Sequence, residues 1–499
     1  MRSTDVLILK PGSQKKVYGK LSSFGLTGIE PPLWACLLAG YLRSLGYSVV
    51  VLDAEVEPRT AGSKDRKAVT HEEAAKKIQE VNPILAVVSV SGTNPSASTM
   101  NMTGAGNIIR YLKQLTSEIK TLFHGLHPSA LPERTMVEEE ADFVCQGEGF
   151  YTLTKLIDAL KVNGDYSQIE GLWYRENGEP KFTFPAQVFK NLDELPMPAW
   201  DLLPMDKYRA HNWHCFGNIE SRQPYGVIYG SLGCPFNCSF CCINAIFGKP
   251  GIRYRSPQKV VDEIDFLVKN YGIRNIKIID EMFAMNEKRV VELCDKIIER
   301  EYDLNMWAYA RVNTVTPKML TKMKQAGINW VAYGFESGNK RVLESVNKKY
   351  DLSSINEVVK MTYNSGLYIV ANFIFGLPDD DLDSMQDTLE MALQINAEWA
   401  NFYTTMAYPG SKLYEEAVKQ GKRLPETWEG YSQYGYESLP LATKHLSPGE
   451  ILSFRDYAFH AYFENPRYLS KIRYLFGLET VQHIKEMAEH KLRRKYTQF

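Results

Sequence analysis

The chain has little of what would place a protein outside the cell or in a membrane. Its 499 residues include only eight cysteines, and half of these lie together, which suggests a metal site in a reducing compartment rather than disulfides. No apolar run approaches the roughly 18 residues of a membrane span. The apolar stretch before Lys10 is too short for a secretory signal. We therefore expect a cytoplasmic protein without a transmembrane segment.

An excess of charge of one sign is also absent. The formal net charge is -1, which gives no electrostatic reason to expect nucleic acid as a partner. Hydrophobic residues make up 44% of the chain, enough to fill proper cores. The length favours two or three compact units.

Strands and helices are expected to alternate in residues 1–165. Apolar runs over residues 5–11, 47–55 and 84–92 are separated by stretches with helical spacing, such as residues 71–83. This alternation predicts an α/β unit with a doubly wound, Rossmann-like parallel sheet. In such sheets ligands bind at the carboxyl ends of the strands.

Three further regions follow. Residues 166–222 contain several prolines and no clear period, and we interpret them as a linker that packs against its neighbours. Residues 223–415 hold apolar runs separated by helical stretches, which predicts a partial (β/α)6 barrel with its chemistry at the carboxyl ends of the strands. Residues 416–499 predict a helical C-terminal domain whose aromatics form core or line an apolar or sugar-like pocket. Its basic end, residues 490–496, is interpreted as a helix that is solvated or touches an anionic membrane surface.

Four of the cysteines lie in the loop after the first predicted barrel strand. The segment GSLGCPFNCSFCC places Cys234, Cys238 and Cys241 in CxxxCxxC spacing and adds Cys242. Three thiolates on one loop can hold three irons of a 4Fe–4S cluster and leave the fourth iron open. A structural zinc site is the alternative, but it needs four ligands, usually in two separated pairs, and the sequence has no second CxxC pair. We therefore predict a cluster, with Cys242 as a bystander.

This segment resembles the signature of the radical S-adenosylmethionine superfamily, with Phe240 as the aromatic residue before the third cysteine. In that family the open iron binds the amino and carboxylate groups of S-adenosylmethionine. An electron from the cluster then cleaves it to methionine and a 5′-deoxyadenosyl radical. The resemblance implies an electron donor of the flavodoxin or ferredoxin type.

The later barrel segments resemble the subfamily that also binds cobalamin, the group of anaerobic magnesium-protoporphyrin cyclases and class B methyltransferases. The segment IIDEMF offers Asp280 and Glu281 as acidic groups for the ammonium of S-adenosylmethionine. The segment AYARVN offers Arg311, whose planar fork suits the carboxylate. The segments GFESG and IFGLPDD would contact the ribose, the methionine end and the adenine. The implied S-adenosylmethionine contacts are Phe240, Asp280, Arg311, Glu336, Ser337 and Gly376.

The N-terminal region resembles the cobalamin-binding half of the same subfamily. It departs from the DxHxxG pattern of methionine synthase-type proteins, because no histidine precedes His71. The loop SGTNPSAST is therefore expected below the corrin. His127 matches a histidine that lines the pocket, with cobalt ligation as an alternative, and glycines beside the nucleotide tail permit close backbone approach. The implied cobalamin contacts are Thr93, Asn94, Ser96, Gly125, His127, Gly147 and Glu148.

The resemblance implies an enzyme with three cofactors, a 4Fe–4S cluster, S-adenosylmethionine and cobalamin. The leading hypothesis is methylation of an unactivated carbon of a small-molecule, lipid or sugar substrate, with the chemistry supplied by the cofactors. Cyclisation or another carbon-skeleton rearrangement is the alternative within the subfamily. A hypothesis from another functional class is a sensor that binds the cofactors without turnover. A sensor would need an output module, such as a helix-turn-helix segment, and none is evident in the sequence.

Overall fold

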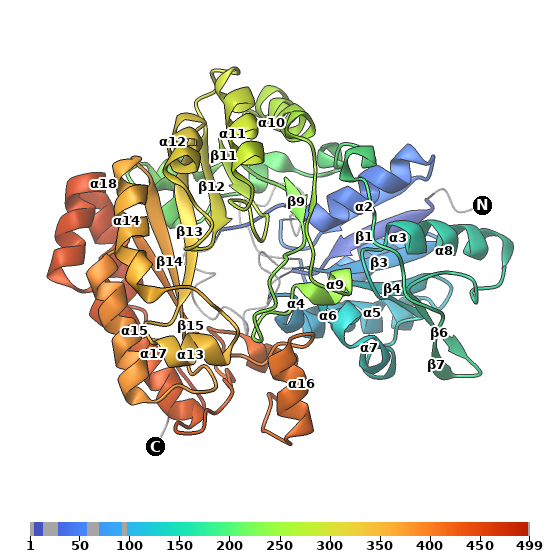
Figure 1. The fold of residues 1–499 in the computed structure, drawn as a ribbon. Coiled ribbons are helices and arrows are strands. Elements are labelled where there is room, and N and C mark those ends of the chain that lie inside the picture. The colour runs from blue at the N-terminus through green and yellow to red at the C-terminus, as the bar shows by residue number, and fades with distance from the viewer. Residues whose placement is uncertain (1–3, 13–27, 57–68, 92–96, 498–499) are drawn as a thin grey trace.

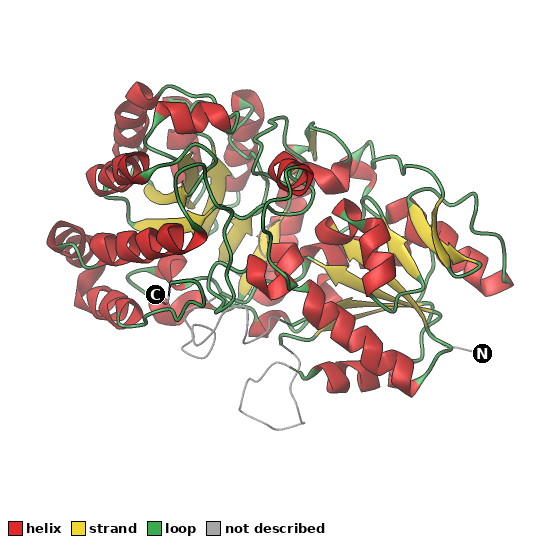
Figure 2. Cartoon of the chain, turned by 90° about the horizontal axis from the view of Figure 1, so that it is seen from below, coloured by secondary structure: helices red, strands yellow, loops and turns green. Residues whose placement is uncertain are grey.

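The computed structural model describes residues 4–12, 28–56, 69–91 and 97–497. Two mainly parallel sheets lie side by side, and helices cover both (Figures 1 and 2). The predicted α/β class with two sheets is confirmed. Within the described ranges, no helix has the length and apolar character needed to cross a membrane.

Seven strands form the first sheet, in the order β2-β1-β3-β4-β5-β6-β7. They are β1 (Val6–Lys10), β2 (Val49–Asp53), β3 (Leu85–Val90), β4 (Lys120–Gly125), β5 (Phe143–Cys145), β6 (Leu172–Glu176) and β7 (Glu179–Phe182). The first five pair in parallel, which is the doubly wound arrangement that the sequence predicts.

Helices pack on both faces of this sheet. They are α2 (Leu33–Ser44), α3 (His71–Val81), α4 (Ala97–Met100), α5 (Met102–Leu115), α6 (Leu126–Ala130), α7 (Pro132–Glu138) and α8 (Phe150–Val162). Alternate residues of β1 enter different cores, because side chains alternate across a strand. Val6 and Ile8 share a core with α2 and α8, whereas Leu7 and Leu9 share one with α3 and α5.

The predicted linker is wrong in part, because β6 and β7 extend the first sheet as an antiparallel hairpin. Asn177 and Gly178 connect the two strands, both with positive φ, as a tight hairpin turn requires. Only short 3-10 helices follow, up to Arg222.

The second sheet has six parallel strands in the order β15-β14-β13-β12-β11-β8. They are β8 (Tyr225–Ile228), β11 (Asn275–Ile278), β12 (Asn305–Ala310), β13 (Ile328–Glu336), β14 (Tyr368–Phe375) and β15 (Trp399–Thr404). Helices follow in turn, α10 (Pro257–Tyr271), α11 (Glu287–Ile298), α12 (Pro317–Gln325), α13 (Lys340–Ser345), α14 (Ile355–Asn364) and α15 (Leu382–Ile395). The predicted partial (β/α)6 barrel is confirmed.

Local signals explain where these helices begin. Ser256 and Thr316 precede proline at the first turn of α10 and α12, and each side-chain oxygen accepts a backbone N–H of that turn. Between β8 and α10 lie the cysteine loop, the short helix α9 (Asn244–Phe247) and the paired strands β9 (Ser231–Leu232) and β10 (Arg253–Tyr254).

The C-terminal region is helical, as predicted, with α16 (Lys412–Lys419), α17 (Pro448–Phe463) and α18 (Pro466–Ala488). The prediction of a basic helix over residues 490–496 is wrong, because α18 ends before it and no helix follows in the described residues. Arg494 is buried there, donates to Gln433 O at 2.8 Å and forms an ion pair with Asp456 at 3.0 Å. The segment therefore packs against the C-terminal helices through this side chain.

Candidate active site

The cysteine loop is anchored by backbone hydrogen bonds and by one aromatic side chain. The Ser239 N–H donates to Val346 O at 3.0 Å, and the Leu413 N–H donates to Ser239 O at 2.8 Å. Phe240 packs between two apolar clusters, one that contains Leu413 and one that contains Val346. These contacts fix the loop between the barrel and α16.

The four cysteines of the loop differ in burial. Cys234, Cys238 and Cys241 all keep some exposure, whereas Cys242 is buried in the main hydrophobic core. Burial raises the pKa of the Cys234 thiol to about 11 and that of Cys242 to about 12, so it is exposure that separates the three predicted ligands from Cys242. This arrangement suits three ligands and one bystander.

Arg311, directly after β12, approaches the same loop. Its Nη1 lies 3.9 Å from Cys238 Sγ, and its guanidinium carbon lies 4.2 Å from the centre of the Phe236 ring. Nη2 donates to Lys349 O at 2.8 Å. Nε is buried and has no hydrogen-bond partner among the described residues. A guanidinium with an unused donor beside the cysteines can bind a carboxylate.

The two acidic residues after β11 have different surroundings. Asp280 accepts from the Gly230 N–H and from the Ser231 hydroxyl, both at 2.6 Å, so it holds the start of the cysteine loop. Glu281 Oε2 is buried without a hydrogen-bond partner in the described part of the chain. Burial raises the pKa of Glu281 to about 8. Asp280 as the ammonium contact stays a prediction, and Glu281 has the freer carboxylate.

The remaining predicted S-adenosylmethionine contacts follow β13 and β14. Glu336 pairs with Lys348 at 2.6 Å, an interaction that sequence reasoning missed. Ser337 Oγ lies 3.2 Å from Thr388 Oγ1 and shapes the turn after β13. Gly376 has a φ of 78°, and a Cβ there would lie 2.7 Å from a side chain of α17. The position therefore requires glycine for packing.

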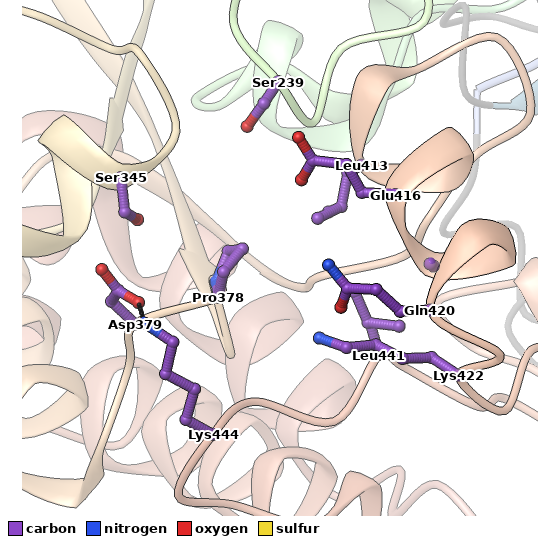
Figure 3. Close-up of a pocket in the computed structure, with 11 residues that line it drawn as sticks. Ser239, Ser345, Pro378, Asp379, Leu413, Glu416, Gln420, Lys422, Leu441 and Lys444 are labelled. Atoms are coloured by element: carbon purple, nitrogen blue, oxygen red, sulfur yellow. Dashed lines mark hydrogen bonds and ion pairs between the residues drawn. The ribbon is translucent and has the colours of Figure 1, made fainter.

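A cavity of about 350 Å³ lies beside the cysteine loop, lined by Ser239, Asp379 and Lys444 among others (Figure 3). Asp379 and Lys444 form an ion pair at 2.5 Å. The described residues that line this cavity include no predicted S-adenosylmethionine contact. It is a separate opening next to the loop.

Part of the predicted cobalamin site, Thr93, Asn94 and Ser96, lies outside the described residues. Gly125 and Gly147 are at the carboxyl ends of β4 and β5, with φ of 129° and 121°. A Cβ at Gly125 would lie 2.4 Å from Val90 O of β3, so strand packing alone requires glycine there. The Gly147 N–H donates to Ser129 Oγ at 3.1 Å.

His127 is buried at the same edge of the first sheet. Its Nδ1 lies 3.1 Å from Thr99 Oγ1, and its backbone N–H donates to Ser98 Oγ at 3.1 Å. Its Nε2 is buried, and no described residue is its hydrogen-bond partner. Burial lowers the pKa of His127 to about 3, so the imidazole is neutral at pH 7. A neutral ring nitrogen can accept a hydrogen bond or bind a metal.

Glu148 forms an ion pair that connects the loop after β5 to β10 of the short β9–β10 pair. Its oxygens lie 3.0 and 2.6 Å from Arg253 of β10, and Oε2 accepts from the Phe189 N–H at 2.7 Å. Its contact with cobalamin stays a prediction. Sequence reasoning missed Arg253, because its partner is 105 positions away.

The two predicted cofactor regions are adjacent. The helix α6, which carries His127, packs against α9, which begins two residues after Cys242. The carboxyl edge of the first sheet therefore borders the cysteine loop of the barrel.

The barrel and the N-terminal sheet each match the model of a known protein family. Residues 228–392 match the model of the radical SAM superfamily, and residues 25–157 match that of the B12 binding domain. An uncharacterized methyltransferase of Pyrococcus horikoshii is 30% identical over 472 residues, which cover 94% of this chain and 95% of the relative. The chain belongs to the cobalamin-binding radical S-adenosylmethionine enzymes.

Two further comparisons agree with this family. The anaerobic magnesium-protoporphyrin IX monomethyl ester cyclase of Rubrivivax gelatinosus is 24% identical and covers 89% of this chain and 76% of its own. The solved structure of the radical S-adenosylmethionine methyltransferase TsrM from Kitasatospora setae has a TM-score of 0.68 at 16% identity, covering 98% of this chain and all of that one. That likeness shows the fold of a cobalamin-binding radical S-adenosylmethionine enzyme.

The predicted family, enzyme class and cofactors are thus confirmed: a 4Fe–4S cluster, S-adenosylmethionine and cobalamin. The donor set of this enzyme fits them. Three cysteines share one anchored loop, Arg311 has an unused buried donor, and His127 has an unused buried nitrogen. Which residues touch each cofactor stays a prediction.

Proposed function

We propose that the enzyme methylates an unactivated carbon of a small-molecule, lipid or sugar substrate. The packing of α6 against α9 carries the proposal, because it brings the cobalamin edge of the first sheet to the cysteine loop. A substrate carbon between them can meet both cofactors. Bound S-adenosylmethionine and its cluster supply a 5′-deoxyadenosyl radical, and bound cobalamin supplies a methyl group.

The chain's own residues position these groups. Cys234, Cys238 and Cys241 hold the cluster. Arg311 pairs with the carboxylate of S-adenosylmethionine through its buried Nε, and Glu281 pairs with the ammonium. Burial of Arg311 Nε and Glu281 Oε2 supports these roles, because a buried unpaired polar atom is costly and gains most from a charged ligand.

Electrons would come from a protein of the flavodoxin or ferredoxin type. The cavity beside Ser239 supports entry of electrons from that side, because it opens next to the cysteine loop and apart from the predicted S-adenosylmethionine contacts (Figure 3). A cytoplasmic location is part of the same proposal.

Methyl-labelled S-adenosylmethionine tests the function without knowledge of the substrate. The anaerobic holoenzyme with dithionite should form 5′-deoxyadenosine, and the deuterated methyl group should be recovered on the bound cobalamin by mass spectrometry. A Cys238→Ala variant should lose 5′-deoxyadenosine and keep cobalamin. Absence of both products from the fully loaded wild type would overturn the proposal.

The cyclase relative from Rubrivivax gelatinosus favours a second candidate, ring formation or another carbon-skeleton rearrangement. The same experiment separates the two. Formation of 5′-deoxyadenosine with no label on cobalamin would favour rearrangement over methylation.

A further inference from the structure

A short segment of the C-terminal region packs against the helices at the edge of the first sheet. We call the 3-10 helix Trp428–Tyr431 the bridging turn. It packs against α4 and α5, which cover one face of the first sheet. Trp428 contacts the hydrophobic core formed by the first sheet with α3 and α5.

Trp428 lies directly on a residue predicted to line the cobalamin pocket. Its indole ring is 4.5 Å from the His127 ring, centre to centre, in an edge-to-face arrangement. His127 Nδ1 lies 3.1 Å from the hydroxyl of Thr99, the last residue of the predicted lower loop. Any large ligand that occupies this edge must contact Trp428 or displace it.

Three contacts hold the bridging turn in place. The Arg134 guanidinium stacks on the Trp428 ring at 4.3 Å. Glu429 is buried, and its Oε2 accepts from Thr103 Oγ1 at 2.8 Å. Tyr431 is buried, and its backbone oxygen accepts from the Tyr408 hydroxyl at 3.2 Å. The Trp428 ring is thus held by His127 and by Arg134, and the neighbouring Glu429 is held by Thr103. We therefore expect a bound ligand to contact the indole and not to displace it.

We propose that Trp428 is a wall of the cobalamin site, so that the C-terminal region completes a site begun by the N-terminal sheet. This inference rests on the proposed function, because it requires cobalamin at the edge that carries His127. Trp428 acts here as a positioning residue, which orients the imidazole and excludes water from the corrin. The Thr103–Glu429 hydrogen bond holds it there.

Cobalamin binding to the full chain tests the proposal without measuring turnover. Hydroxocobalamin is titrated into anaerobic protein with its cluster in place, and binding is followed by the visible absorbance of the corrin. Trp428→Ala should weaken binding by about tenfold or more, and Trp428→Phe should recover most of it. Glu429→Gln should weaken binding less, because a glutamine oxygen still accepts the Thr103 hydroxyl.

Controls distinguish the possible failures. Glu426→Gln, whose side chain is 78% exposed in the same loop, should bind like the wild type. Iron content reports whether each variant is folded, and hydrogen exchange at residues 428–431 should slow in the wild type when hydroxocobalamin is added. If Trp428→Ala binds hydroxocobalamin as tightly as the wild type, or if hydrogen exchange at residues 428–431 does not change when cobalamin binds, Trp428 is not a wall of the cobalamin site. A wild type that binds no cobalamin would instead overturn the proposed function.

Discussion

The ion pair between Glu148 and Arg253 should couple the edge of the first sheet to the β9–β10 pair beside the cysteine loop. The Glu148 side chain is 2% exposed and that of Arg253 is 19% exposed, so the carboxylate depends on this partner. Arg253→Met would leave the Glu148 carboxylate with only the Phe189 N–H as a donor. We expect this to lower the free energy of unfolding by about 3–5 kcal/mol. Glu148→Gln keeps an acceptor for Phe189 and leaves a partly hydrated guanidinium, at a cost of about 1–2 kcal/mol.

A double-mutant cycle measures the coupling. The double variant should lose less free energy of unfolding than the two single variants lose together, by about 2 kcal/mol. A chain of several units need not unfold in one step, so native-state hydrogen exchange at Phe189 is the better assay than a melting curve. In Arg253→Met this amide should exchange about a hundredfold faster or more. Exchange at the wild-type rate, or strictly additive losses, would refute the reasoning.

Three further predictions concern single side chains. Cys238→Ala should lose the visible absorbance of the cluster, whereas Cys242→Ala should keep it, since Cys242 is a core residue. Burial raises the pKa of Glu281 from 4.5 to about 8, so the neutral carboxyl stabilises the iron-free fold at low pH. Thermal stability of that form should fall as the pH rises from about 4.5 to 8, and Glu281→Gln should make this fall shallower, because Glu139 and Asp380 titrate in the same direction. An equal slope in both proteins would contradict it. His127→Ala should weaken hydroxocobalamin binding by about tenfold in the same titration, and equal affinity would remove His127 from the site.

The sequence predicts the two sheets because of how parallel strands are buried. Runs such as residues 84–92 and 368–376 are mostly apolar, as is typical of strands covered on both faces. The cysteine loop could be predicted as well, because its three ligands lie within eight positions of one another. Local spacing alone carries that information.

Contacts between distant segments could not be predicted in this way. Trp428 and His127 are 301 positions apart, and Arg253 and Glu148 are 105 apart, so no periodicity connects them. Arg494 belongs to a basic run that is typical of a solvated surface, and its buried partner Asp456 is known only from the fold. The hairpin at Asn177 did have a local signal, the Asn-Gly pair, inside a stretch too polar to suggest a strand.

The claim that both cofactors act in one enzyme is tested most directly by metal analysis. The measurement is the iron, sulfide and cobalt content of protein purified anaerobically after expression with cobalamin supplied. An enzyme that uses both cofactors should contain about four irons and about one cobalt per chain. About four irons without cobalt would contradict the claim, because the radical chemistry would then lack its methyl carrier.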